Sequence, residues 1–415
     1  MDDTPRMRSM DVLTAEPRRG RAAARPAGRL DRWVLAQMRR RLQGIPLRVS
    51  LWDGTSTRLS DTPEVAEVFV KDRRTLLALV RDPAVAFGDA YAGGRLEVRG
   101  DLLRLLEAVY AHWQGTPAGH RVEQPRREPS DRERARANIH YHYDLGNDFY
   151  RLWLDEQLVY TCAYFPTPGT SLEEAQTAKF EHVCRKLRLR PGDTVVEAGC
   201  GWGAFALHMA RHYGVTVRAY NISREQIRFA RARARAEGLD GRVEFVEDDY
   251  RNVRGSCDVF VSVGMLEHVG RENYRAFAEV IDRCLAPSGR GLLHFIGRDR
   301  PRALNAWIRK RIFPGAYPPT LAEVAREVLE PVSLSVVDVE NLRLHYALTL
   351  RHWRARFEAA KGRVAEMFDE SFVRAWRLYL AGSEAGFTTG YLQLFQVTFA
   401  RAAADTAWTR AELYR

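Results

Sequence analysis

The chain has 415 residues, of which 46% are hydrophobic and 28% charged, a globular composition long enough for two domains. It contains no run of 18 or more apolar residues, so no membrane-spanning helix is expected. The formal net charge of +11 favours an anionic partner, either nucleic acid or an acidic membrane surface, although a general preference for Arg would explain the same excess.

The N-terminal residues 1–28 are polar and Arg-rich, and they lack the apolar segment of a secretory signal. They are expected to form a disordered basic tail. The five cysteines are scattered and include no CxxC pair, which argues against both a disulfide framework and a zinc site. This cysteine usage fits a reducing cytoplasm, where we expect the protein to work.

A small α+β domain is predicted over residues 29–113, with a role in lipid binding or dimerisation. It starts with a basic amphipathic helix over 30–43, whose apolar face is expected to comprise Leu30, Trp33, Val34 and Met38. Such a helix can lie on lipid, but packing on its own domain is the commoner outcome. Residues 114–137 are rich in Pro, Gly, Arg and Glu and are interpreted as a linker.

Strands and helices alternate through much of residues 138–415. The expected strands are 194–198, 215–220, 243–247, 258–263, 290–296, 333–339 and 391–401, and helices are expected at 203–213, 223–237, 271–285, 320–329 and within 341–381. This alternation predicts an α/β fold, in which a mainly parallel seven-stranded sheet carries helices on both faces. Ligands of such sheets bind beyond the carboxyl ends of the strands.

A glycine-rich turn, TVVEAGCGWGAF at residues 194–205, follows the first strand of this region. Glu197 precedes three alternating glycines, of which Gly199 and Gly201 are the first two, and the pattern lacks the spacing of a dinucleotide or P-loop motif. A carboxylate at the strand end suits a ligand with a cationic amino-acid end, such as S-adenosylmethionine (AdoMet). The alternative is an ordinary tight turn of an α/β domain.

The ends of the next two strands carry further polar side chains. Asn221, Ser223 and Gln226 are able to bind the ribose hydroxyls of a cofactor, although Ser223 also suits a helix cap. Asp248 or Asp249 is able to accept a hydrogen bond from an adenine amino group. A solvated acidic turn is the alternative for these two aspartates.

Two titratable residues follow at the same predicted edge. Glu267 comes just after the apolar strand 258–263, where a carboxylate is unlikely to be an incidental surface charge. His294 lies in the apolar run GLLHFIG, where a buried core histidine is the more common interpretation. The aromatic-rich stretch 138–165 also contains His140 and His142, but no third ligand is suitably spaced, so no metal site is expected.

Five ordered motifs strongly resemble those of the cyclopropane-fatty-acyl-phospholipid synthase family, which includes the mycolic acid cyclopropane synthases. They are HYDLGNDFYRLWLDEQLVYTCAYF, VVEAGCGWGAFALHMA, NISREQ, SVGMLEHVG and LLHFIG, and FGDAYAGGRLEVRGDL resembles the N-terminal domain of longer members. The resemblance implies a Rossmann-like AdoMet-dependent methyltransferase domain. It also implies a C-methyltransferase that converts the double bond of an unsaturated phospholipid acyl chain into a cyclopropane ring.

The resemblance assigns two sets of site residues. AdoMet-binding positions match Tyr160, Thr161, Gly199, Gly201, Asn221, Ile222, Gln226, Asp248 and Asp249. Family members usually have Thr at the position of Asn221 and Ser at that of Thr161. A bound bicarbonate is expected at Cys162 and Ile296, through their backbones, and at Glu267, His294 and Tyr346.

The chemistry implied by the resemblance requires that the reactants be positioned exactly and that water be excluded from the site, because an isolated alkene is a poor nucleophile. Methyl transfer leaves a carbocation on the chain, which the aromatic faces of Tyr160, Phe165 and Tyr346 are able to stabilise. Bicarbonate would then remove a proton from the new methyl group to close the ring. Loss of a proton from a chain carbon would instead give a methylene branch, and a hydride donor would give a methyl branch.

The segment ALNAWIRKRIFPGAY, residues 303–317, suits contact with anionic lipid because it combines basic side chains with Trp307, Ile308, Ile312 and Phe313. A helix that covers the sheet is the alternative. We expect the protein to be peripheral on the inner face of the membrane, without nucleic acid as a partner. A noncatalytic lipid-binding module remains an alternative for the first domain alone.

Overall fold

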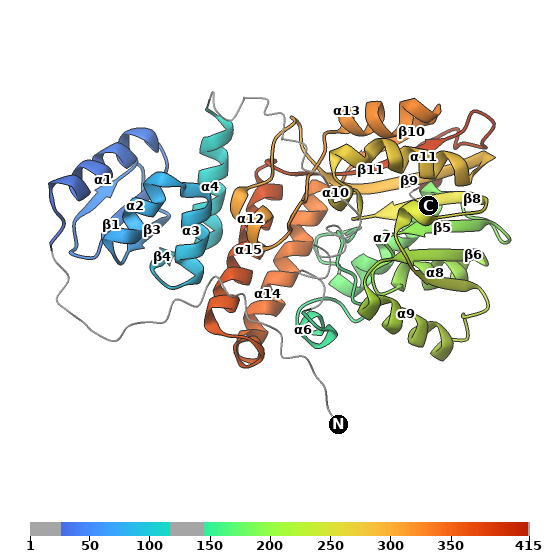
Figure 1. Ribbon diagram of the computed structural model, residues 1–415, viewed down its shortest axis with the longest axis horizontal. Coiled ribbons are helices and arrows are strands. Elements are labelled where there is room, and N and C mark those ends of the chain that lie inside the picture. Colours follow the sequence, from blue (N-terminus) through green and yellow to red (C-terminus); the bar gives the residue numbers. More distant parts are fainter. Residues whose placement is uncertain (1–25, 117–144, 414–415) are drawn as a thin grey trace. The chain divides into compact units, whose positions relative to one another are not determined.

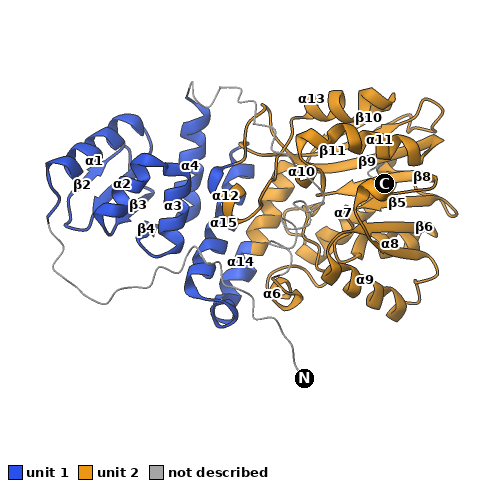
Figure 2. Ribbon diagram, in the orientation of Figure 1, with its two compact units in different colours: residues 1–121, 305–307, 354–389 blue, residues 122–304, 308–353, 390–415 orange. Residues whose placement is uncertain are grey.

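The computed structural model describes residues 26–116 and 145–413. Residues 1–25 of the predicted tail, most of the predicted linker, and His140 and His142 lie outside these ranges. The chain divides into two compact units (Figure 2). Unit 1 combines the N-terminal region up to 121 with 305–307 and 354–389, and unit 2 contains the rest.

Unit 1 is built on a four-stranded sheet of order β2-β1-β3-β4, in which β1 and β3 are parallel. Its elements are α1 (Arg29–Arg41), β1 (Leu47–Leu51), β2 (Ser56–Arg58), β3 (Ala66–Val70), α2 (Arg73–Arg81), α3 (Pro83–Ala92), β4 (Leu96–Gly100), α4 (Leu102–Gln114) and α15 (Glu370–Thr388). The Arg374 side chain on α15 donates to the carbonyl oxygens of Tyr91 and Leu96. The domain boundaries expected from the sequence, 29–113 and 138–415, stay predictions. They place residues 354–389 in the catalytic domain, whereas the structure groups these residues with unit 1.

Unit 2 contains a seven-stranded sheet, as the alternation predicts, and its strand order is β10-β11-β9-β8-β5-β6-β7 (Figure 1). Only β10–β11 and β11–β9 pair antiparallel. Its strands are β5 (Thr194–Ala198), β6 (Thr216–Asn221), β7 (Val243–Glu247), β8 (Cys257–Val263), β9 (Leu285–Gly297), β10 (Ser335–Asn341) and β11 (Gln393–Ala400). The helices include α6 (Asn147–Arg151), α7 (Leu172–Lys186), α8 (Ala204–Tyr213), α9 (Arg224–Ala236), α10 (Leu266–Val269), α11 (Tyr274–Cys284), α12 (Ala306–Arg311), α13 (Leu321–Val324) and α14 (Arg343–Met367). The division into units cuts α12 after Trp307 and α14 after Trp353.

Both faces of this sheet are apolar, which explains why its strands read as near-continuous hydrophobic runs. Side chains of neighbouring residues point to opposite faces, so Val195 and Val261 pack with α7, α8 and α9. Val196 and Phe260 pack instead with α11 and α13. Figure 1 shows α8 and α9 on one side of the sheet and α11 and α13 on the other.

The structure differs from the predicted elements in three places. Helix α7 precedes β5 and was not predicted, although Ser171 and Glu174 form a capping box at its start. The region 341–381 divides into α14 and α15, where Asp369 caps the second helix. The predicted helix 320–329 is α13 followed by a π-helical segment, Ala325–Leu329.

No helix of the described residues is long and apolar enough to cross a bilayer.

Candidate active site at the carboxyl edge of the sheet

The glycine turn joins β5 to α8 with a backbone that only glycine adopts easily. Gly199, Gly201 and Gly203 have φ values of +88°, +53° and +85°. A Cβ at Gly203 would lie 2.5 Å from the Phe245 ring, whereas a Cβ at Gly201 would meet no heavy atom within 4 Å. Gly203 therefore serves helix–sheet packing, and Gly201 leaves backbone open to a ligand.

The end of β6 lies directly against this turn. Nδ2 of Asn221 donates to the Gly201 carbonyl at 3.3 Å and to Oε1 of Gln226 at 2.7 Å. Ser223 caps α9 by accepting from the Gln226 N–H, as its alternative interpretation predicts. Ile222, between them, is half-buried. The structure thus joins two separate sequence motifs into one surface.

Asp248 and Asp249 follow β7 and hydrogen-bond within their own turn. Asp248 accepts from the Asp249 N–H and from Asn252, and Asp249 caps the short helix 250–252 while pairing with Arg251 at 3.1 Å. The Asp248 N–H donates to the Asn221 carbonyl at 3.1 Å, which places this turn beside the end of β6. Both carboxylates are half-buried at the edge where the glycine turn lies.

Helix α7 holds the loop that contains Tyr160, Thr161 and Cys162. Nζ of Lys179 donates to Oγ1 of Thr161 at 2.8 Å, and Gln176 donates to the Thr161 carbonyl at 2.9 Å. A Cβ at Gly264, just past β8, would lie 2.8 Å from the Thr161 side chain. This close approach brings the loop against the end of the strand that leads to Glu267.

Lys179 and Glu197 are two buried titratable residues that influence each other electrostatically. Burial raises the pKa of Glu197 to about 8, against the opposing charge of Lys179. Burial also lowers the pKa of Lys179 to about 8, while Cys162, Asp155 and Glu197 oppose that shift. Oε2 of Glu197 is buried and has no hydrogen-bond partner among the described residues. It is therefore available to a cationic group.

Glu267 sits on α10, and its orientation is fixed from β9. The Ile296 N–H donates to its Oε1 at 2.5 Å, while its buried Oε2 has no partner within the described ranges. Burial raises the pKa of Glu267 to about 7, although the Ile296 hydrogen bond acts in the opposite direction. The Ile296 N–H, which we expected to bind the ligand, therefore donates to Glu267, which is itself an expected site residue.

His294 lies on β9 two residues before Ile296, so both side chains share one face of the strand. Its Nδ1 lies 3.1 Å from Nε2 of Gln396, and its buried Nε2 has no partner in the described part of the chain. Burial, with Lys179 and Lys186 nearby, lowers the pKa of His294 well below its ordinary value. The His294 carbonyl accepts from the Gly264 N–H at 2.8 Å, which ties it to the end of β8.

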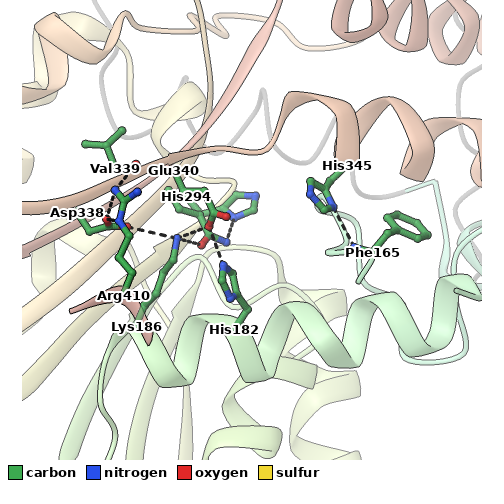
Figure 3. Close-up of polar contacts among 10 residues, drawn as sticks. Phe165, His182, Lys186, His294, Asp338, Val339, Glu340, His345 and Arg410 are labelled. Carbon is green, nitrogen blue, oxygen red and sulfur yellow. Dashed lines mark hydrogen bonds and ion pairs between the residues drawn. The ribbon is translucent and has the colours of Figure 1, made fainter. Parts of the chain in front are cut away.

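The first turns of α14 fix the loop on its other side. Oγ1 of Thr349 accepts from the Ala163 N–H at 3.0 Å. Nδ1 of His345 accepts from the Phe165 N–H at 3.0 Å, and Figure 3 shows this second hydrogen bond. Tyr346 lies between these two residues on the same helix and is 8% exposed. Burial raises the pKa of the Cys162 thiol, which precedes Ala163 in this loop, so the thiol stays protonated and uncharged.

An aromatic cluster lines the same region of unit 2. Tyr160 lies 5.1 Å from Trp153 and 5.3 Å from Trp353 between ring centroids, and Trp353 in turn lies 5.9 Å from Tyr346. Trp202 of the glycine turn donates to Asn147 on α6 at 2.7 Å. The cluster therefore connects the cofactor side of the site with the Tyr346 side through apolar surface.

Two predicted lipid-facing surfaces are only partly exposed. Trp307 is buried and donates to Asp89 at 3.0 Å, and Ile312 is buried as well, while Ile308 and Phe313 are half-buried. On α1, Val34 is buried, whereas Leu30 and Trp33 are 48% and 57% exposed. The expected apolar face of α1 is thus divided, since Val34 is buried together with Leu35 while Leu30 and Trp33 are largely exposed to solvent.

Sequence reasoning missed the residues that support the site. Lys179, Gln176, Thr349 and Gln396 are all buried and hydrogen-bonded to the predicted loop or to His294. Polar residues inside otherwise apolar helical or strand faces are the signal that marks them. That signal needs the faces to be assigned first, and α7 itself was not predicted.

Comparison with known proteins identifies the family of the chain. The family described as mycolic acid cyclopropane synthetase matches residues 130–397, and a domain family of unknown function matches 34–116. A probable fatty acid methyltransferase of Pseudomonas putida is 37% identical over 92% of this chain and 100% of its own length. The cyclopropane-fatty-acyl-phospholipid synthase of Escherichia coli K12 is 41% identical over 63% of this chain and 66% of its own.

A solved structure is also similar to this chain. The mycolic acid cyclopropane synthase CmaA1, crystallised with SAH and CTAB, is 32% identical with a TM-score of 0.61 and covers 67% of this chain and 99% of its own. The fold is thus that of an AdoMet-dependent methyltransferase, preceded by a small α+β region. The chain is an AdoMet-dependent C-methyltransferase that cyclopropanates or methylates fatty acyl chains, and it belongs to the mycolic acid cyclopropane synthetase family.

Proposed function

We propose that the enzyme transfers the AdoMet methyl group to the double bond of an unsaturated phospholipid acyl chain and yields a cyclopropane ring, with a bound bicarbonate as the base. One observation carries the proposal. Oε2 of Glu267 and Nε2 of His294 are both buried and unpartnered among the described residues. They belong to neighbouring parts of the sheet edge, because Glu267 accepts from the Ile296 N–H, and Ile296 lies two residues from His294 on β9. Buried polar atoms without partners are costly, and a small polar ligand between them would satisfy both.

The residues present fit AdoMet. Oε2 of Glu197 suits its ammonium group, the open backbone at Gly201 suits its sugar and chain, and Asn221 with Gln226 suits the ribose. Tyr160, Thr161, Ile222, Asp248 and Asp249 complete the proposed set. When bound, AdoMet supplies the electrophilic methyl group that an isolated alkene needs.

The residues also fit a small oxyanion. His294 is uncharged, so one of its nitrogens donates while the other accepts. Glu267 has a pKa near 7 and can accept a proton or donate one from its free oxygen. Tyr346 and the backbone of Cys162 form the rest of the proposed site. When bound there, bicarbonate supplies a general base in a place that water cannot easily enter.

The remaining side chains exclude water and stabilise positive charge. Tyr160 packs against Trp153 and Trp353, and an aromatic face attracts a desolvated cation by about 2 kcal/mol. Phe165, packed on His352 at 5.5 Å, extends this surface. These residues favour a carbocation on the acyl chain over its capture by water.

A phospholipid substrate places the enzyme at a membrane surface. The positive net charge and the exposed Leu30 and Trp33 of α1 support a peripheral contact with anionic lipid on the cytoplasmic face. The named phospholipid synthase of Escherichia coli supports the same substrate class. We propose no nucleic-acid partner, and dimerisation through unit 1 is a further proposal.

Incubation with unsaturated phospholipid vesicles and methyl-labelled AdoMet tests this function. We expect label in the lipid acyl chains and cyclopropane protons in the proton NMR spectrum of the product. Alkene protons of a methylene group, or a saturated methyl branch, would replace the proposed product with the corresponding branched chain. Label absent from lipid but present in free fatty acid would overturn the phospholipid substrate, and bicarbonate-free buffer should slow ring formation.

A further inference from the structure

Three residues on neighbouring strands form a polar row that leads to His294. Glu340 on β10 pairs in register with Gln396 on β11, and Gln396 pairs in register with His294 on β9. Side chains at paired positions share one face of the sheet. All three are buried or half-buried there, so their hydrogen bonds are protected from water.

Helix α7 packs beside this polar row, and two nitrogen-bearing side chains on one face of the helix contact Glu340. His182 and Lys186 are four residues apart, and Figure 3 shows both side chains pointing toward Glu340, with His294 nearby. Nε2 of His182 lies 2.7 Å from Oε2 of Glu340, and Nζ of Lys186 lies 2.5 Å from the same oxygen. Although burial raises the pKa of Glu340, these two neighbours lower it to about 2.

The direction of each hydrogen bond follows from which groups are able to donate. Lys186 also lies 2.9 Å from Oε1 of Gln396, and an ammonium group has donors only. The carbonyl oxygen of Gln396 must therefore face Lys186, and its NH₂ group must face His294. Because an amide NH₂ only donates, Nδ1 of His294 accepts the 3.1 Å hydrogen bond.

We propose that Gln396, oriented by Lys186, is a positioning residue that fixes the tautomer of His294, so that the proton lies on Nε2. An uncharged imidazole whose Nδ1 accepts must carry its proton on Nε2. That nitrogen is the one without a partner among the described residues, so it enters the site as a donor. A donor attracts an oxyanion, whereas the other tautomer would present a lone pair and repel it. This last step rests on the proposed function, but the tautomer itself does not.

The tautomer is measured directly on the purified full-length enzyme labelled with ¹⁵N in its histidine rings. Protonated and unprotonated ring nitrogens have separate ¹⁵N shifts, and a His294→Gln sample identifies the His294 signals. We expect a protonated Nε2 and an unprotonated Nδ1 in the wild type. A protonated Nδ1 would overturn the proposal, whatever activity the enzyme shows.

Gln396→Glu tests the cause. The new carboxylate has nearly the same shape and accepts from both Lys186 and His294, so the proton should move to Nδ1. Turnover should fall on the order of a hundredfold with little change in the KM for AdoMet, because only the donor at Nε2 is lost. An unchanged tautomer in a folded Gln396→Glu enzyme would contradict the role of Gln396.

Thr398→Val is the matched control. Thr398 is also buried on β11, two residues from Gln396, and its hydroxyl has no partner within the described residues. Its replacement should leave the His294 signals and turnover unchanged. If Thr398→Val lowers turnover as much as Gln396→Glu, the effect belongs to packing of the strand and the proposal fails. A wild type with the expected tautomer but no methyl transfer would reject the proposed function alone.

Discussion

The backbone N–H of Ile296 donates to Oε1 of Glu267 at 2.5 Å, and the second carboxylate oxygen of Glu267 is left buried without a partner among the described residues. One oxygen is thus fixed by the sheet, and the other is free to act on a ligand. Because a backbone group does the fixing, a side chain of the same shape at 267 should keep its orientation.

Glu267→Gln should lower turnover on the order of a hundredfold while AdoMet affinity stays nearly unchanged. The amide oxygen still accepts from Ile296, but the side chain no longer carries a carboxylate whose pKa is about 7. Methyl incorporation into lipid and titration calorimetry with AdoMet give the two readouts. Glu279→Gln is the control, since Glu279 is exposed and pairs only with Arg275 on the surface. Full activity of Glu267→Gln would refute the role of Glu267.

Gly201→Ala and Gly203→Ala should separate cofactor binding from folding. Both glycines have positive φ, so either substitution costs about 1–2 kcal/mol of stability. At Gly203 the new methyl group would also meet Phe245 and Ala230, which adds about 1–3 kcal/mol. At Gly201 it would point into open space beside Asn221, where we place the cofactor.

Thermal unfolding should therefore show Gly203→Ala as the more impaired variant, and AdoMet titration should show Gly201→Ala as the more impaired one. Gly203→Ala should have the lower melting temperature, and a folded Gly201→Ala should bind AdoMet at least about tenfold more weakly, equivalent to 1.4 kcal/mol. Unchanged affinity of Gly201→Ala would show that the open backbone does not contact the cofactor.

The glycine turn, the strands of the sheet and the edge position of the site follow from the sequence because they depend on local patterns. Glycines with alternating spacing, apolar runs and polar residues at strand ends each predict a feature within a few residues of themselves. The support for His294 depends instead on Gln396, which is 102 residues away, and on Lys186 from a helix that the periodicity did not indicate. Such pairs are set by strand register and helix packing, which one sequence does not specify.

Glu197 should make the stability of the enzyme fall as the pH rises. Its folded pKa is about 8 against 4.5 in the unfolded chain, so the folded state holds a proton that the unfolded state has released between these values. The stabilising contribution is complete below pH 4.5 and is lost as the pH rises through about 8. The slope is at most about 1.4 kcal/mol per pH unit.

Urea unfolding of the cofactor-free enzyme at several pH values, compared with Glu197→Gln, measures this contribution. The free energy of unfolding of the wild type should fall with pH relative to the variant, which has no proton to lose. Parallel pH profiles for the two proteins would mean that Glu197 ionises normally in the folded state.

The exposed pair Leu30 and Trp33 on α1 is the apolar surface of unit 1 that best suits a lipid contact. Both side chains are about half exposed, and Arg29 and Arg32 beside them are exposed as well. Apolar side chains next to cations favour insertion at an anionic interface, where burial and charge attraction add.

A Leu30→Ala, Trp33→Ala double variant should partition at least about tenfold more weakly onto anionic phospholipid vesicles, because each large apolar side chain contributes about 1.5–3 kcal/mol when fully buried. Leu77→Ala on α2 is the control, since Leu77 is 42% exposed in the same unit. Sedimentation with vesicles gives the partition coefficients, and higher salt should weaken binding of all three proteins. Turnover on detergent-dispersed substrate should stay at the wild-type value in the double variant, because none of the proposed site residues belongs to α1. If the double variant and Leu77→Ala bind vesicles equally well, the membrane contact lies elsewhere on the protein.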